Sequence, residues 1–440
     1  MIMIKEKKIL LISLVLLLFF ESTEAKTQKL ESQLQDQLPE LMKKVVDWRH
    51  DLHKYPELSN REFRTSKKVE EHLNSLDMEV ITGVAHTGVI GILRGNRQGP
   101  MVALRADMDG LPVKEMTGLS YASNQKSVYN GKNVDVMHAC GHDAHVAILM
   151  GVAEYFSSIR NKIPGSIMFI FQPAEEGAPV GEQGGARLML KEGIWSKELP
   201  DVIFGLHVTN APHGLIAYRE GPAMAASDSW KIIIKGKQAH GSTPWASVDP
   251  IMVAFQLGNN LQTIVSRKLD LRESPAVISV GSVHGGVRSN IIPNTVEMEG
   301  TIRTFDPVIR DEIIKEMNII AKGTAAIAGA TVEVIVPNGE NYPVTFNDLE
   351  LTKKVLPILE NIVGDDLLYR TERSTGAEDF SFFSEKIPGF YFFLGVNEPG
   401  VDPSNTAGNH SPYFLIDDPA LETGVKSLSH LTLNYLFGEI

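Results

Sequence analysis

The chain has 440 residues, a formal net charge of -12 and a single cysteine. The acidic balance argues against a nucleic-acid partner, which calls for a basic surface, and one cysteine cannot form an intrachain disulfide. A chain of this length is expected to contain more than one domain.

The first 25 residues have the features of a cleavable secretory signal. Three lysines at 5–8 precede an almost unbroken apolar run at 9–20, and Thr23, Glu24 and Ala25 resemble a cleavage site. The apolar run is shorter than the roughly 20 residues of a membrane span, so we expect a removable signal rather than an anchor. An uncleaved signal anchor is the alternative. The last residues lack a KDEL-like retrieval signal, so the predicted location is the secretory pathway, either the endoplasmic reticulum lumen or outside the cell.

Strands and helices alternate in the mature chain. Leu41, Val45, Trp48 and Leu52 recur at helical spacing and predict an opening amphipathic helix. Apolar runs then predict buried strands at 102–107, 166–171 and 202–206, with a helix at 144–159. This order predicts an α/β sheet whose functional site lies beyond the carboxyl ends of its strands.

The decapeptide VMHACGHDAH, residues 136–145, is the densest group of chemically active side chains. It contains His138, Cys140, His142, Asp143 and His145. A thiolate, imidazoles and a carboxylate form a plausible ligand set for a transition metal. A lone thiol in an oxidising compartment suggests the same use, whereas a buried inert cysteine or an intermolecular disulfide is the alternative.

Polar residues also follow the predicted strands. Asp107 and Asp109 follow the first strand, and the adjacent pair Glu175 and Glu176 follows the second. Neighbouring carboxylates repel, so such a pair suggests a cation between them or separate roles, although an ordinary solvated turn has the same composition. After the third strand, His207 is the expected ligand, and His213 is the second choice.

A different pattern begins near residue 223. Alternation and helical periodicity predict the order β-α-β-β-α-β, which is a ferredoxin-like unit inserted into the larger domain. The predicted elements are strands at 230–235, 276–283, 295–305 and 331–336, and helices at 250–268 and 308–328. The expected domains are therefore 36–222, 223–337 and 338–440. Arg303 lies on the same face of its predicted strand as the polar residues, because side chains two residues apart point the same way. An arginine that is simply solvated is the ordinary explanation for such a position.

The α/β pattern resumes after the inserted unit. A loop of small residues with two carboxylates at 374–380 precedes an apolar strand at 390–396, and His410 follows in a turn. Asn409 begins a glycosylation sequon. A glycan there would obstruct a ligand at His410, so we predict that Asn409 is unmodified.

The ordered motifs resemble the amidohydrolase branch of the M20 metallopeptidase family over nearly all of the mature chain. The motifs that carry the resemblance are LRADMDGLP, MHACGHDAHVA, QPAEEG, GLHV, KGKQAHGSTP, GGVRSNIIP, GTIRTFD, GAEDFSFF and GNHSP. The resemblance implies an α/β catalytic domain with a central mixed sheet and an inserted ferredoxin-like α+β lid. It also implies a homodimer formed through the lid.

The resemblance implies roles for nine residues. The ligands of two divalent metal ions would be Cys140, His142, Glu176, His207 and His410. Glu175 would be the general base, His240 would stabilise the oxyanion, and Asn290 and Arg303 would hold the substrate's carboxylate or backbone. Relatives imply Mn²⁺ first, with Zn²⁺ as the alternative. One departure is Arg105, which stands where other M20 peptidases carry a ligand histidine, so Asp107 is expected to lie outside the ligand set.

Three functions remain open from the sequence. A signal segment before this branch looks most like the plant hydrolases that release indole-3-acetic acid, an auxin, from its amino-acid conjugates. The same chemistry on other N-acyl amino acids, such as jasmonoyl, benzoyl or acetyl conjugates, is the second reading. The third is a non-catalytic protein that binds conjugates. In each case the partner is a small molecule, without nucleic acid or a membrane anchor after signal cleavage.

Overall fold

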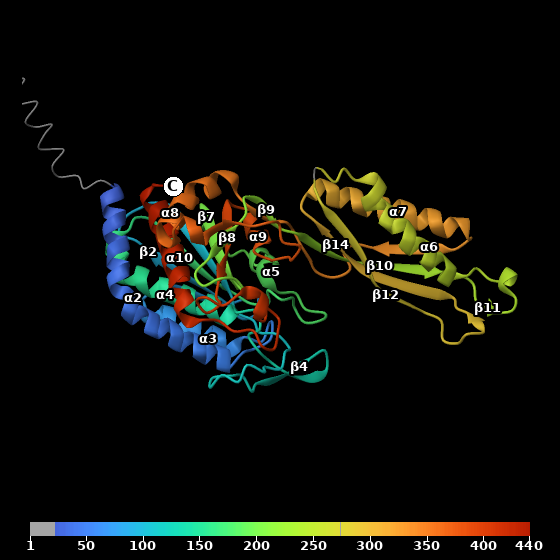
Figure 1. Ribbon diagram of the computed structural model, residues 1–440, viewed down its shortest axis with the longest axis horizontal. Helices are drawn as coiled ribbons and strands as arrows, with labels where there is room; N and C mark the ends of the chain where they lie inside the picture. Colours follow the sequence, from blue (N-terminus) through green and yellow to red (C-terminus); the bar gives the residue numbers. More distant parts are fainter. Residues whose placement is uncertain (1–22, 273) are drawn as a thin grey trace, which may run out of the picture. The chain divides into compact units, whose positions relative to one another are not determined.

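The structure, a computed structural model, describes residues 23–272 and 274–440. The predicted signal at 1–25 therefore lies outside the described residues except for its last three, and its cleavage and the predicted location stay predictions. The described chain forms two compact units (Figure 1). The first unit comprises residues up to 217 together with 350–369 and 391–440, and the second comprises 218–349 and 370–390.

The first unit is built on an eight-stranded mixed sheet of order β1-β2-β6-β3-β7-β19-β8-β18. Strand β3 runs parallel to β6 and β7, whereas β1, β2 and β6 pair in antiparallel fashion. This confirms the predicted mixed α/β sheet. The strands are β1 Glu79–Val84, β2 Gly88–Arg94, β3 Met101–Asp107, β6 Ser166–Gln172, β7 Val202–Thr209, β8 Ile216–Tyr218, β18 Leu368–Arg370 and β19 Gly389–Gly395.

Three helices pack together beside this sheet: α2 Thr23–Lys54, α4 His142–Ile159 and α10 Leu421–Phe437. The opening helix starts earlier than the expected domain start at residue 36. Its buried stripe already includes Leu30 and Leu34, which explains the longer helix. The unit also contains helices α3 Phe63–Ser75, α5 Gly185–Lys191 and α8 Leu349–Val363, and a hairpin of β4 Lys126–Tyr129 and β5 Lys132–Asp135. Among the described residues, no helix has the length and apolar character of a membrane span.

Strand register brings the carboxyl ends of β3, β6 and β7 together. Asp107 lies opposite Gln172, and Arg105 lies between Ile170 and Gly205. The third predicted strand is longer than expected, because β7 continues to Thr209, so His207 lies within the strand rather than after it. The loops that leave β3 and β6 therefore begin beside the imidazole-bearing end of β7.

The second unit contains the predicted ferredoxin-like fold. Its sheet order is β12-β14-β10-β15, covered by two helices in the order β-α-β-β-α-β. Gly300 makes this packing feasible, since a Cβ there would lie 2.4 Å from Trp230. The elements are β10 Ala226–Lys235, α6 Pro250–Thr263, β12 Ala276–Gly285, β14 Thr295–Thr304, α7 Pro307–Ile327 and β15 Thr331–Ile335. Shorter elements are β9 Gly221–Met224, β11 Ala239–His240, β13 Ile291–Ile292, β16 Asn341–Tyr342, β17 Thr345–Asn347 and α9 Ser381–Ser384.

Candidate metal centre

The candidate centre starts at the amino end of α4. Cys140 and His142 flank Gly141, which has a left-handed backbone with φ of 95°. Glycine is favoured there because a Cβ would lie only 2.3 Å from a methyl group of Val208. The turn therefore places a thiol and an imidazole on either side of one tightly packed residue.

Cys140 lies between two imidazoles that come from distant parts of the chain. Its Sγ is 3.3 Å from Nε2 of His207 on β7 and 3.2 Å from Nε2 of His410 in the late turn. The same His410 nitrogen is 3.1 Å from Oε1 of Glu176. Four of the five expected ligands thus meet around the sulfur.

The fifth expected ligand, His142, has its ring fixed from one side. Its Nδ1 is 3.2 Å from Oδ1 of Asp109, while its buried Nε2 has no hydrogen-bond partner among residues 23–272 and 274–440. That free nitrogen is 3.9 Å from Oε2 of Glu175. A carboxylate behind one ring nitrogen commonly orients a histidine that binds metal through the other.

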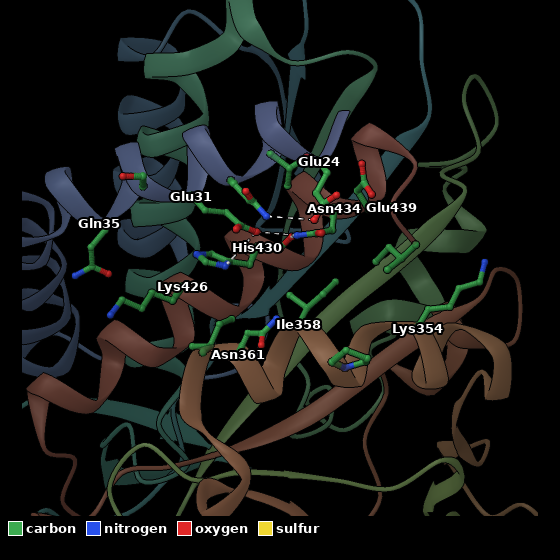
Figure 2. Close-up of a pocket in the computed structure, with 16 residues that line it drawn as sticks. Glu24, Glu31, Gln35, Lys354, Ile358, Asn361, Lys426, His430, Asn434 and Glu439 are labelled. Atoms are coloured by element: carbon green, nitrogen blue, oxygen red, sulfur yellow. Dashed lines mark hydrogen bonds and ion pairs between the residues drawn. The ribbon is translucent and has the colours of Figure 1, made fainter. Parts of the chain in front are cut away.

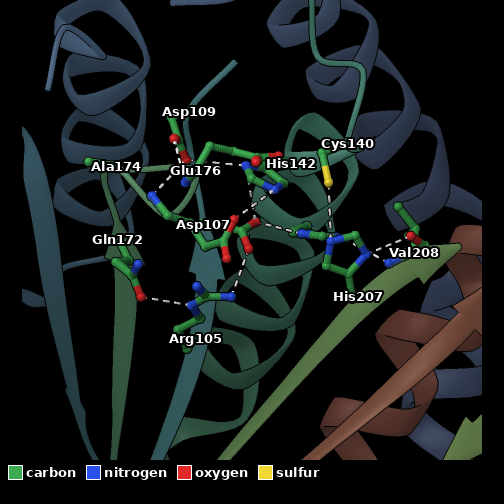
Figure 3. Close-up of polar contacts among 12 residues, drawn as sticks. Arg105, Asp107, Asp109, Cys140, His142, Gln172, Ala174, Glu176, His207 and Val208 are labelled. Atoms are coloured by element: carbon green, nitrogen blue, oxygen red, sulfur yellow. Dashed lines mark hydrogen bonds and ion pairs between the residues drawn. The ribbon is translucent and has the colours of Figure 1, made fainter. Parts of the chain in front are cut away.

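His145, three residues further along α4, is held differently. Its Nε2 accepts the Val208 N–H at 2.8 Å, so its Nδ1 carries the proton and donates to Asp107 at 2.5 Å. Both nitrogens are therefore used within the protein. Arg105 donates to the other oxygen of Asp107 at 2.7 Å and to Gln172 at 2.9 Å, as Figure 3 shows. His145 and Arg105 thus occupy both oxygens of Asp107 with buried donors.

Buried carboxylates dominate the electrostatics of the centre. Burial and the charge of Glu176 raise the pKa of Cys140 well above its ordinary value. Burial alone would lower the pKa of His142, but Asp107 raises it to about 10. The hydrogen bond to Glu176 raises the pKa of His410. The buried negative charge of the centre therefore favours protonation of its side chains. A bound cation would balance the same negative charge.

The donor atoms fit a divalent metal. Sets of three that lie within 4.8 Å of one another include the side chains of Cys140, His142 and His207, of Cys140, Glu176 and His410, and of His142, Glu175 and Glu176. Sulfur, imidazole and carboxylate ligands suit Zn²⁺ and related ions. The overlapping sets agree with a cluster that could hold more than one ion.

Three other candidate side chains, His213, His138 and Asp143, belong to none of the metal-binding groups found among the described residues. His213, the second choice for the ligand on β7, instead pairs with Asp417 at 2.7 Å. His138 is fully buried, and neither of its ring nitrogens has a hydrogen-bond partner within the described part of the chain. Asp143 accepts from Arg49 at 3.1 Å and from His53 at 2.9 Å.

Arg49 and His53 were missed in the sequence, although a signal was present. Both are almost fully buried on the apolar stripe of α2, which also carries Val45 and Leu52. An arginine and a histidine four residues apart on such a stripe indicate a buried acidic partner. That partner is Asp143 in the first turn of α4, so the pair anchors the helix that begins with His142.

The expected residues of the second unit fall into two places. His240 and Asn290 are neighbours, because β11 pairs with β13 and the Gly241 N–H donates to the Asn290 carbonyl at 2.8 Å. Arg303 lies near the other end of β14, opposite Ser227. Eight residues of strand separate Thr295 from Arg303, which is about 26 Å. Within one chain, His240 and Asn290 therefore do not meet Arg303.

Asn409 is fixed beside the centre. Its side-chain amide donates to the carbonyls of Cys140 at 2.9 Å and Val208 at 3.0 Å. A glycan on this nitrogen would break at least one of those hydrogen bonds.

A cavity of about 670 Å³ lies away from the cluster, beside α2, α8 and α10 (Figure 2). Its central acid, Glu31, is 3.3 Å from His430 Nδ1 and accepts from Asn434 at 2.8 Å. In the part of the chain that the structure describes, these residues belong to none of the groups of side chains that could hold a metal. The centre beside β3, β6 and β7 is therefore the better candidate for catalysis, despite the size of this cavity.

The mixed sheet and the cluster at its strand ends define a metal-dependent hydrolase. A family model described as peptidase family M20/M25/M40 matches residues 103–434, so the chain belongs to that family. Within it, the protein is a metal-dependent amidohydrolase.

Named relatives support this assignment. Thermostable carboxypeptidase 1 of Saccharolobus solfataricus is 41% identical, with 92% of this chain and 99% of the relative covered. IAA-amino acid hydrolase ILR1-like 2 of Arabidopsis thaliana is 35% identical, with 98% and 95% covered. The Bacillus subtilis YXEP protein, described as a dinuclear metal binding peptidase from the M20 family, superposes with a TM-score of 0.74 at 34% identity, covering 90% of this chain and 99% of that one.

Proposed function

We propose that this amidohydrolase cleaves the amide bond of N-acyl amino acids, and that its substrates are indole-3-acetic acid conjugates. The observation that carries the proposal is the position of Glu175, whose carboxylate is 3.9 Å from the unpartnered nitrogen of His142. The similarity to a plant hydrolase that is named for such conjugates supports indole-3-acetyl as the acyl group of the substrate. Other N-acyl amino acids are the second candidate, since a Bacillus subtilis relative named N-acetylcysteine deacetylase is 36% identical to this chain.

We assign the metal ligands to the five donors named from the sequence, with Mn²⁺ as the first ion and Zn²⁺ as the alternative. The proposed ligands are Cys140, His142, Glu176, His207 and His410. Bound divalent ions supply Lewis acidity, which polarises an amide carbonyl and acidifies water. The buried, unpartnered nitrogen of His142 supports this assignment because such an atom is costly unless a ligand satisfies it.

The protein's own groups would then move the proton and hold the substrate. Glu175 takes a proton from the attacking water and passes it to the leaving amine nitrogen. His240 donates a hydrogen bond to the oxyanion as negative charge develops on the former carbonyl oxygen. Arg303 binds the carboxylate of the amino-acid part, for which a planar guanidinium is suited.

We further propose that the second unit forms a homodimer. His240 and Asn290 lie together at the pairing of β11 with β13. Strand β14 extends over about 26 Å from Thr295 to Arg303, and a small conjugate cannot span that length. In a homodimer, the partner's His240 and Arg303 of this chain would act on the same substrate.

A panel of conjugates tests the proposal. Release of free amine would be measured from indole-3-acetyl, jasmonoyl, benzoyl and acetyl amino acids, with and without a chelator. We expect chelator-sensitive release, fastest from the indole-3-acetyl conjugates. Faster release from another acyl group would favour the second candidate, and no chelator-sensitive release from any conjugate would refute the function.

A further inference from the structure

Glu62 is a buried acid that the proposed reaction does not use. Its side chain is fully buried, and burial together with the charge of Asp109 raises the pKa of Glu62 to about 8. A carboxyl group is costly to bury unless it makes hydrogen bonds. The Glu62 carboxyl accepts the Ala174 N–H at 2.9 Å and the Thr87 hydroxyl at 2.5 Å.

The side chain of Glu62 does not serve the helix that follows it. Glu62 stands at the cap position of α3 but makes no capping hydrogen bond. Glu57 does so instead, accepting the N–H groups of Arg64 at 3.0 Å and Thr65 at 2.9 Å. The carboxyl group of Glu62 instead points toward the loop after β6.

That loop has a strained backbone beside the two adjacent glutamates. Ala174 is buried with φ of 53°, a left-handed conformation that residues with a Cβ seldom adopt. Such conformations persist where surrounding contacts enforce them, commonly at active sites.

The enforcing contacts are two carboxyl groups. Glu62 accepts the N–H of Ala174, while Asp109 accepts those of Glu175 and Glu176, both at 3.1 Å. Figure 3 shows Asp109 beside Ala174 and Glu176. Three successive N–H groups are thus fixed by acids from outside the loop, which sets the direction of the two glutamate side chains.

We propose that Glu62 is a positioning residue for the hydrolysis, because its hydrogen bond to Ala174 fixes the left-handed turn that aims the Glu175 carboxylate. The inference rests on the proposed role of Glu175 as the base. Glu62 is neither a proposed metal ligand nor a proposed substrate-binding residue, so its loss should misplace the base without changing how the substrate binds.

The test uses the full chain loaded with Mn²⁺. In Glu62→Gln, the amide oxygen still accepts the Ala174 N–H, so kcat should stay within about threefold of wild type. In Glu62→Ala that acceptor is lost, and kcat should fall about 10–100-fold, since a misplacement near 1 Å costs up to about that much. KM and metal content should change by less than about twofold. Thr87→Val is the matched control: it removes the other hydrogen bond of Glu62, and should lower the melting temperature with kcat unchanged.

If the alanine variant does not fold, Glu62→Asp provides a second test. Its shorter side chain moves the carboxylate away from the Ala174 N–H, so kcat should also fall. Unchanged kcat in a folded Glu62→Ala or Glu62→Asp protein would overturn the inference, as would an equal loss in Thr87→Val. Failure of the proposed function looks different: wild type would lack chelator-sensitive hydrolysis, or Glu175→Gln would remain fully active.

Discussion

Replacing Gly141 with alanine should damage the centre without removing any donor atom. The residue has φ of 95°, and an added Cβ would lie 2.3 Å from the Val208 methyl and 3.3 Å from Ile416. A left-handed backbone costs a residue with a Cβ about 1–2 kcal/mol, and overpacking a core costs about 1–3 kcal/mol. We therefore expect Gly141→Ala to lower the free energy of unfolding by about 2–5 kcal/mol.

The damage should reach the ligands through Val208. The carbonyl of Val208 accepts from His207 Nδ1 at 2.7 Å, and its N–H donates to His145. A displaced Val208 would turn the His207 ring away from Cys140. Metal content should therefore fall together with stability.

Urea unfolding of the metal-loaded protein measures the stability, and elemental analysis measures the metal. Gly118→Ala is the matched control, since Gly118 has φ of 77° but no atom within 4 Å of an added Cβ. In Gly118→Ala the free energy of unfolding should fall only by the cost of the left-handed backbone, about 1–2 kcal/mol. Repeating both measurements in chelator separates the steric clash from metal loss, because the clash persists without metal. An equal loss in Gly141→Ala and Gly118→Ala would refute the reasoning.

Four further predictions concern single side chains. Glu175→Gln should lose about 10²–10⁴-fold in kcat while keeping its metal; retained turnover would remove the base assignment. Burial alone would lower the pKa of His53, but the charge of Asp143 raises it to about 9. Because the pKa of His53 is higher in the folded state, protonated His53 stabilises the fold fully below pH 6.5, and this stabilisation is lost as the pH rises through 9. Between these pH values, the free energy of unfolding should fall by up to about 3 kcal/mol more in wild type than in His53→Gln. Parallel curves of stability against pH for the two proteins would contradict this. Metal binding to metal-free protein at pH 7 should release a proton from the buried Cys140 thiol, because ligation needs the thiolate; calorimetry in buffers of different ionisation enthalpy measures it, and Cys140→Ser should release fewer protons. Intact mass of secreted protein should show Asn409 without a glycan; a glycan there would contradict the placement of its amide.

Apolar runs and the periodicity of apolar residues predicted most of the fold, because these patterns form helices and strands with little dependence on distant contacts. The apolar runs of β3 and β6 are buried on both faces, and such runs read clearly as strands. The lid elements alternate or repeat at helical spacing, and their order alone predicts the ferredoxin-like sheet. The start of α2 was missed because the apolar positions at Leu30 and Leu34 lie among polar residues and become a buried stripe only against neighbouring elements.

The candidate site was less accessible to sequence reasoning. Cys140 and His142 stand out by composition, but Glu62 lies 112 residues from its partner Ala174. Nothing in the local pattern around Glu62 distinguishes it from Glu57, which caps the same helix. The difference arises from the tertiary fold, which turns one acid toward its own helix and the other toward the loop after β6.

The choice between neighbouring histidines shows why the supporting contacts matter as much as the ligand types. His142 and His145 lie three residues apart on α4, and both are buried imidazoles close to Asp107. The Val208 N–H occupies Nε2 of His145, whereas no described group occupies Nε2 of His142. The carbonyl of the same Val208 holds Nδ1 of His207, which leaves that ring's Nε2 facing Cys140. One residue of β7 therefore occupies one imidazole and orients another, so the proposed ligand set depends on where β7 lies beside α4 and not on the spacing of histidines in the motif.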